Sequence, residues 1–101
     1  MEESLKKEIV QHVIKNLLDI QILRLINKQP TWGYKIKKEI ENISGLKIRH
    51  GALYPLLRKL EDKGLITSQE QQLGKRTRKI YTITEKGKTY LKIYSNIVTE
   101  L

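Results

Sequence analysis

The sequence has no cysteine, no phenylalanine and only one tryptophan in 101 residues. The lack of cysteine excludes disulfides and thiolate metal sites. The two histidines, His12 and His50, are isolated from each other in the sequence, so no metal site is expected. Apolar residues make up only 39% of the chain, which allows one domain with a small core. We therefore expect a single domain over residues 1–101, with a second copy of the chain adding to its buried surface.

Long apolar runs are also missing. No segment approaches the roughly 20 apolar residues that cross a bilayer, and the first ten residues, MEESLKKEIV, lack the apolar region of a signal peptide. The sequence shows no carboxylate pair, nucleophile–base set or phosphate-binding loop. We therefore expect a soluble cytoplasmic protein that is not an enzyme, uses no cofactor and does not act at a membrane.

Acidic residues are scarce relative to basic ones. The chain has 20 Lys and Arg against 11 Asp and Glu, which gives a formal net charge of +9. Most of the excess lies between Lys47 and Lys79, where nine basic residues face three acidic ones. A charge excess of this size favours a polyanionic partner, above all nucleic acid.

Residues 2–28 have helical periodicity on two sides. One apolar stripe contains Leu5, Ile9, Val13, Leu17 and Ile20, and the other contains Val10, Ile14, Leu18, Ile22 and Leu25. One stripe can face the core of the domain, while the other needs a second surface, most simply a partner subunit. Asn16 is a candidate N-cap that would divide the segment. Whether residues 1–28 form one helix or two is left open by the sequence.

Two more helices are predicted over residues 32–43 and about 50–63. Pro30 cannot continue the first helical segment, and Thr31 is a candidate N-cap for the second. The inward candidates of this second segment are Tyr34, Ile36, Ile40 and Ile43. In the third segment, an apolar stripe of Leu53, Leu56, Leu57 and Leu60 is followed by Gly64 as the C′ residue. Helix, short connector and helix predict a helix-turn-helix.

The rest of the chain predicts a hairpin and a last helix. Strands are expected over residues 65–72 and 78–84, with the loop at 73–77. Thr84 would cap a helix over residues 85–101. The predicted fold class is mainly α with a small β-hairpin, a winged helix-turn-helix with added N- and C-terminal dimerisation helices. We assign residues 1–16 to a helical extension, 17–84 to the winged helix-turn-helix and 85–101 to the dimerisation helix.

Several motifs resemble the PadR family of transcriptional regulators. These are GALYPLLRKLEDKGLI (Gly51–Ile66), GKRTRKIYTITEKG (Gly74–Gly87), WGYKI (Trp32–Ile36) and LLDIQILRLI (Leu17–Ile26). The resemblance implies a homodimeric, repressor-type regulator that binds double-stranded operator DNA. It also implies a possible small hydrophobic effector. Arg49 and His50 depart from the family pattern, which often has Ser or Thr and then Pro, so the base contacts there are expected to differ.

The predicted DNA contacts come from three segments. Pro55 restricts the reading end of the third helix to about Arg49–Tyr54, because proline is tolerated only near a helix start. The cations after Leu73 form a wing suited to phosphates or the minor groove. The predicted contacts are Arg49, His50, Gly51, Ala52, Tyr54, Arg58, Lys59, Lys75, Arg76, Thr77, Arg78, Lys79, Thr31, Tyr34 and Lys35. Tyr34 is also a core candidate, and a charged hairpin also protects a sheet edge.

The predicted dimer interface uses both terminal helices. Tyr90, Tyr94, Ile97 and Leu101 recur at coiled-coil-like spacing. The full predicted interface is Leu5, Ile9, Val13, Tyr90, Leu91, Tyr94, Ile97, Val98 and Leu101. Two other functions use the same features: a non-specific architectural DNA-binding protein and a winged-helix protein-interaction module.

Overall fold

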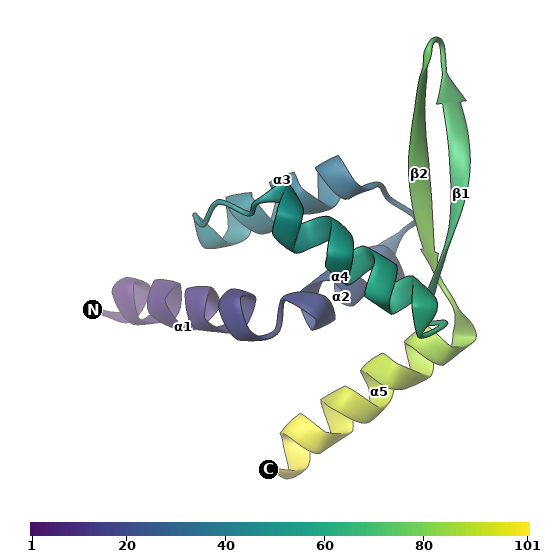
Figure 1. The fold of residues 1–101 in the computed structure, drawn as a ribbon. Helices are drawn as coiled ribbons and strands as arrows, with labels where there is room; N and C mark the ends of the chain where they lie inside the picture. The colour runs from purple at the N-terminus through teal and green to yellow at the C-terminus, as the bar shows by residue number, and fades with distance from the viewer.

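A computed structural model describes all 101 residues, from Met1 to Leu101. Five helices and one antiparallel hairpin follow each other along the chain (Figure 1). They are α1 (Glu2–Asn16), α2 (Leu18–Lys28), α3 (Gly33–Ser44), α4 (His50–Asp62), β1 (Ile66–Leu73), β2 (Arg76–Ile83) and α5 (Glu85–Glu100). Three helices followed by a hairpin form the predicted winged helix-turn-helix, with α1 and α5 added at its ends.

The N-terminal segment consists of two helices. Helix α1 ends with Leu17 outside helical geometry, at φ −130° and ψ 40°. The prediction that Asn16 caps α2 is wrong. Its Nδ2 instead donates backward to the carbonyl of His12 at 2.8 Å, because a terminal carbonyl of α1 lies within reach of its own last side chain.

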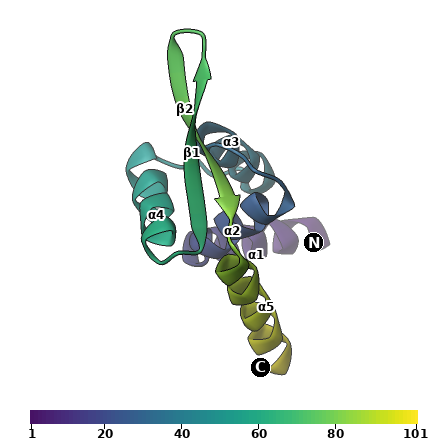
Figure 2. The same ribbon diagram turned by 90° about the vertical axis from the view of Figure 1, so that its right-hand side faces the viewer.

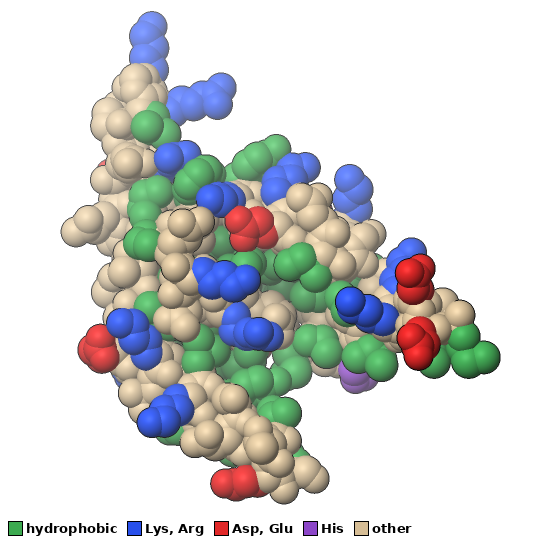
Figure 3. All heavy atoms as spheres, turned by 180° about the vertical axis from the view of Figure 1, so that it is seen from behind, with side chains coloured by type: hydrophobic (Ala, Val, Ile, Leu, Met, Phe, Trp, Pro, Cys, Tyr) green, Lys and Arg blue, Asp and Glu red, His purple; other side chains and the backbone are tan.

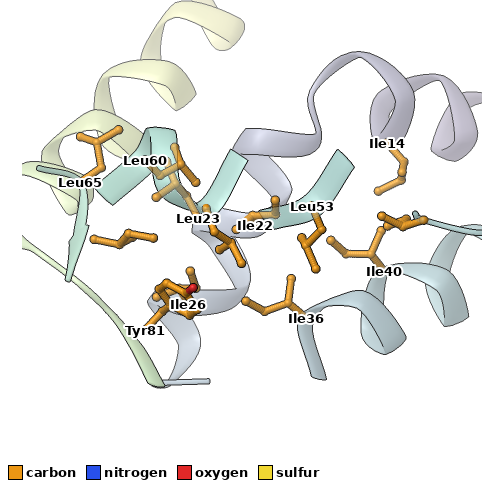
Figure 4. Close-up of a cluster of buried hydrophobic side chains, with 13 residues drawn as sticks. Ile14, Ile22, Leu23, Ile26, Ile36, Ile40, Leu53, Leu60, Leu65 and Tyr81 are labelled. Carbon is orange, nitrogen blue, oxygen red and sulfur yellow. The ribbon is translucent and has the colours of Figure 1, made fainter. Parts of the chain in front are cut away.

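The core lies between α2, α3, α4 and the base of the hairpin (Figure 4). Its buried residues include Ile14, Ile22, Leu23, Ile26, Ile36, Ile40, Ile48, Leu53, Leu57, Leu60, Leu65, Ile66 and Tyr81. The leucine stripe of α4 is confirmed, with Leu56 only partly buried. The prediction that Tyr34 and Ile43 point into the core is wrong, since the two residues are 56% and 64% exposed. The buried line of α3 runs through Gly33, Ile36, Ile40 and Ser44, and it leaves these two outside.

The end of α4 is closed by Gly64, as predicted. Its φ is +77°, a left-handed value that favours glycine. The N–H of Leu65 donates to Leu60 O at 3.0 Å and that of Gly64 donates to Glu61 O at 2.9 Å, the pattern of a Schellman-type ending. The chain therefore turns directly from α4 into the hairpin.

The turn of the hairpin is shorter than predicted, and both strands reach further toward the tip. The register of the hairpin runs from Ile66 opposite Ile83 to Leu73 opposite Arg76, so Arg76 and Thr77 belong to a strand instead of the loop. A two-residue turn, Gly74–Lys75, is sufficient because Gly74 adopts φ +60°. The hairpin projects well beyond the helices, and α5 leaves the body in the opposite direction (Figures 1 and 2).

The joint between α4 and α5 is tightly bonded. Thr84 caps α5 as predicted, because its Oγ1 accepts from the N–H of Gly87 at 3.0 Å. The same hydroxyl donates to Gly64 O at 2.7 Å, and Lys86 Nζ donates to Lys63 O at 2.7 Å. A Cβ on Gly87 would lie 2.2 Å from the carbonyl oxygen of Leu65. The start of α5 is thus fixed against the end of α4.

No helix of the structure has the length and apolar content of a membrane span. No cluster of three or more His, Cys, Asp or Glu side chains is arranged to hold a metal ion.

Candidate nucleic-acid interface

The start of α4 exposes the side chains that the sequence predicts to read DNA. Arg49, His50, Gly51, Ala52 and Tyr54 are all exposed. The rings of His50 and Tyr54 stack with centroids 5.7 Å apart and an 18° angle between planes. This contact follows from the i, i+4 spacing of the two residues on a helix. The stacked pair gives the start of α4 an exposed aromatic surface.

Tyr54 also joins α4 to α3. A Cβ on Gly33 would lie 2.8 Å from the phenol oxygen and 2.9 Å from a ring carbon of Tyr54. Only glycine therefore lets the tyrosine ring lie against the first turn of α3. The ring is still 43% exposed, so it fixes the two helices while keeping one surface free.

The turn between α3 and α4 is held by polar side chains that sequence reasoning missed. The Glu41 carboxylate accepts from the N–H of Ile48 at 2.8 Å. This hydrogen bond lowers the pKa of Glu41, and Lys37, Lys38 and Lys47 lower it further against the raising effect of partial burial. No motif marks Glu41 in the sequence, because its partner is a backbone group that only the turn brings near.

Helix α1 supports the same turn. Gln11 Nε2 donates to Ser44 O at 3.1 Å. The buried Ser44 hydroxyl donates to Ile40 O at 2.8 Å and accepts from the N–H of Leu46 at 3.1 Å. The N-terminal extension therefore steadies the segment that presents the start of α4, a role that its apolar pattern did not indicate.

The wing cations fall into two groups. Lys75, Arg76, Thr77 and Lys79 are exposed, and Figure 3 shows Lys and Arg side chains at the far end of the hairpin. Arg78 is half-buried, with its guanidinium carbon 3.7 Å from the centroid of the Trp32 ring. Its Nε donates to Gln71 Oε1 at 3.0 Å. The structure thus turns Arg78 toward the body of the protein.

The third predicted segment is only partly available. Thr31 is 4% exposed, its N–H donates to Tyr81 O at 3.1 Å, and its carbonyl accepts from Tyr81 N at 2.7 Å. The predictions that Thr31 caps α3 and contacts a phosphate are wrong, because this bridge buries it and Trp32 occupies the N-cap. Tyr34 and Lys35 remain at the start of α3 with substantial exposed surface.

A cleft of about 820 Å³ lies between the start of α3, α4 and the wing. It brings Trp32, Tyr34 and Tyr54 near Arg58 and Arg78, while Glu61 and Asp62 line it on α4. Burial raises the pKa of the Tyr81 phenol in this cleft, and Glu61 and Tyr54 raise it further. Arg58 and Lys59 are exposed on α4, as expected for phosphate-contact candidates.

The terminal helices leave apolar side chains uncovered. Leu5 and Ile9 of α1 are 50% and 62% exposed, whereas Val13 is half-buried. In α5 the exposed apolar residues are Tyr90, Ile93, Ile97 and Val98, with Leu101 following the helix. Ile93 is not part of the coiled-coil-like spacing that the sequence predicts for this helix. Leu91 instead packs partly against the core, and Tyr94 is half-buried.

Comparison with known proteins places this geometry in a family. The sequence model of the transcriptional regulator PadR-like family matches residues 22–93. A helix-turn-helix-type transcriptional regulator of Methanocaldococcus jannaschii is 35% identical over 72 residues, which cover 71% of this chain and 70% of that protein. The negative transcriptional regulator PadR of Bacillus subtilis is 36% identical over 78 residues, covering 74% of this chain and 43% of that protein.

Solved structures agree with the sequence comparison. A PadR family transcriptional regulator of Eggerthella lenta matches with a TM-score of 0.78 at 26% identity, over 97% of this chain and 86% of that one. B. subtilis PadR in complex with operator DNA matches with a TM-score of 0.71 at 33% identity, over 78% of this chain and 46% of that one. The chain therefore belongs to the transcriptional regulator PadR-like family.

Proposed function

We propose that this protein is a homodimeric, sequence-specific repressor that binds double-stranded operator DNA through α4 and the wing. The observation that carries the proposal is that the start of α4 and the basic hairpin are both exposed and that Tyr54 lines the same cleft as Thr77 and Lys79 of the wing. A structural relative, B. subtilis PadR, was solved with operator DNA. Regulation of transcription requires access to DNA, so the proposed site of action is the cytoplasm of a prokaryotic cell.

The proposed base contacts lie at the start of α4. In helix-turn-helix docking, N-terminal residues of the recognition helix reach base edges in the major groove. The Arg49 guanidinium suits a guanine edge, and Ala52 and the Tyr54 ring suit a thymine methyl. His50 supports the Tyr54 ring through their stacking contact, and Gly51 leaves room for close approach, since no atom lies within 4 Å of a Cβ built there.

The proposed phosphate contacts surround this centre. Lys75, Arg76, Thr77 and Lys79 of the wing are exposed and suit phosphates or the minor groove. Arg58 and Lys59 lie further along α4, where they suit backbone phosphates. Tyr34 and Lys35 stand in the first turn of α3, where the positive end of the helix dipole favours an anion.

The proposed dimer covers the apolar surfaces of α1 and α5. Two-fold symmetry would place two copies of α4 in successive major grooves, about 34 Å apart. A cleft of about 520 Å³ between α2 and α5 is lined by Leu91, Tyr94 and Val98. If a small hydrophobic effector exists, this cleft beside the proposed interface is where it would bind.

A competition experiment tests the proposed function. DNA fragments bound by the purified protein are selected from genomic DNA, and the best fragment is labelled for anisotropy titrations. We expect the scrambled duplex to compete at least about a thousandfold less well. Equal competition would instead support an architectural protein, and no binding to any duplex would support a protein-interaction module.

Two charge-matched variants locate the interface. Arg49→Ala should weaken operator binding by about 1–3 kcal/mol and relax the preference at one base pair. Lys28→Ala removes the same charge from the exposed end of α2 and should leave binding close to wild type. Equal losses in both variants would show that only overall charge matters.

A further inference from the structure

The base of the wing is joined to the connector between α2 and α3. Thr31 and Tyr81 form an isolated antiparallel bridge, with backbone hydrogen bonds of 3.1 and 2.7 Å. Through this single residue pair, the connector lies beside β2 in the position of a third strand. Strand alternation then places Trp32 on the same side of the sheet as Ile80 and, diagonally, Arg78.

Arg78 of β2 lies between a side chain of β1 and a side chain of the connector, and the three residues form one row across the sheet. Gln71 of β1 lies directly opposite Arg78 in the hairpin register and accepts from its Nε at 3.0 Å. On the other side, the guanidinium carbon lies 3.7 Å from the centre of the Trp32 ring. Guanidinium stacking on an indole is the most favourable kind of cation–π contact between side chains.

We propose that Arg78 is a positioning residue, held by Trp32 and Gln71, that fixes the angle of the wing against the start of α3. The proposal rests on the proposed DNA-binding function. In this arrangement the contact sets where the exposed cations Lys75 and Arg76 meet DNA, while the guanidinium of Arg78 stays on the indole. The hairpin beyond Arg78 is exposed on both strands. Its further side-chain hydrogen bond, from Gln72 Nε2 to Gly74 O at 2.7 Å, stays within the turn, so the row formed by Gln71, Arg78 and Trp32 is where the hairpin meets the connector before α3.

The first test needs no DNA. Because the chain has no cysteine, spin labels attach only at introduced sites, Lys75→Cys at the wing tip and Asn42→Cys on α3. Labelled protein is diluted with unlabelled protein, so that distances between subunits do not contribute. Electron double resonance then measures the spread of the distance between the two labels. We expect a distribution about twofold broader in Trp32→Leu and in Arg78→Leu, because either change removes the stacking contact.

Two variants control this measurement. Lys79→Leu removes a cation from the next position of β2, where the side chain is exposed, and should leave the distribution unchanged. Trp32→Phe keeps an aromatic ring under the guanidinium and should restore most of the wild-type distribution. Distributions in Trp32→Leu and Arg78→Leu that equal the wild type would overturn the proposal, whether or not the protein binds DNA.

The second test uses operator binding. Trp32→Leu and Arg78→Leu should each weaken binding by about tenfold, and the double variant by no more than either one, because both act through one contact. If Arg78 contacts a phosphate directly, Arg78→Lys would bind like the wild type and Trp32→Leu would have no effect. That result, or additive losses in the double variant, would overturn the proposal. If the wild-type protein bound no operator, the proposed DNA-binding function would be wrong. The spin-label measurement would then still test whether Arg78 and Trp32 fix the angle of the wing.

Discussion

The region from α2 to β2 and the two terminal helices use their apolar residues in opposite ways. Between α2 and β2, side chains such as Leu23, Ile36 and Leu57 are fully buried within one chain. In α1 and α5, Leu5, Ile9 and Ile97 remain about half exposed. Both regions show helical apolar stripes in the sequence. A stripe therefore tells where a helix has an apolar side, but not whether the surface that covers it belongs to the same chain.

Removing a core side chain tests the first half of this comparison and should have the largest effect. Leu57→Ala should lower the free energy of unfolding by about 2–5 kcal/mol, because a buried cavity remains. Leu73→Ala removes the same atoms from a side chain that is 45% exposed at the wing tip and should change stability by less than about 0.5 kcal/mol. Urea denaturation measures both. Equal losses would show that the wing tip is packed as firmly as the core.

Gly87 tests the joint between the two regions. Gly87→Ala should destabilise the fold by about 1–3 kcal/mol, because the added Cβ would lie 2.2 Å from Leu65 O and 2.6 Å from Ile83 Cγ1. Gly51→Ala serves as the control for stability, since a Cβ there meets no atom within 4 Å. Thermal unfolding followed by circular dichroism distinguishes them. Similar melting curves for the two variants would contradict a tight joint.

Polar substitution on α5 tests the second half of the comparison. Ile97→Gln should weaken the proposed dimer by about ten- to a hundredfold, because an Ile side chain loses its burial in each subunit. Lys92→Gln places the same residue on the opposite side of α5 and should leave association unchanged. Sedimentation at a series of concentrations gives the dissociation constants. A wild-type protein that remains monomeric at micromolar concentration would contradict the dimer itself.

Glu41 provides the smallest expected effect, one that is present at neutral pH and lost in acid. The folded-state pKa of Glu41 lies below its usual value of 4.5, chiefly because of the hydrogen bond from Ile48 N. A lowered folded pKa means that the carboxylate stabilises the fold above about pH 4.5 and loses this contribution as pH falls through the folded value. Urea denaturation of wild type and Glu41→Gln should therefore differ at neutral pH and converge in acid. A difference that grows as the pH falls would contradict this role.

Local signals in the sequence predicted local features correctly. The leucine stripe of α4, the glycine ending at Gly64 and the Thr84 cap each depend on residues close together in the sequence. The order of helices and hairpin followed from them. These features need no knowledge of what lies across the fold, because helix periodicity and capping are properties of the segment itself.

Contacts between distant segments explain the errors. Thr31 has the composition of an N-cap, but its backbone pairs with Tyr81, which lies fifty residues away. Ile43 has the apolar character of a core residue, but α3 buries a neighbouring line. The contact of Arg78 with Trp32 was not predicted either, because Trp32 lies on a different segment. In each case the deciding partner comes from another segment, and no spacing rule in the sequence identifies it. The DNA-contact and dimer residues themselves remain predictions.

The bonded joint between α4 and α5 has a consequence for how such a regulator changes its target. Thr84 and Lys86 donate hydrogen bonds to the carbonyls of Gly64 and Lys63 at the end of α4. We therefore expect α4 and α5 to move as one rigid body. In the proposed dimer, the angle at which two α5 helices cross then sets the separation of the two reading ends. Substitutions among the exposed apolar residues of α5, far from DNA, would change the spacing between half-sites, while the bases that each α4 reads would stay the same. In this arrangement, α4 would determine the base sequence of each half-site, and α5 would determine the spacing between the two half-sites.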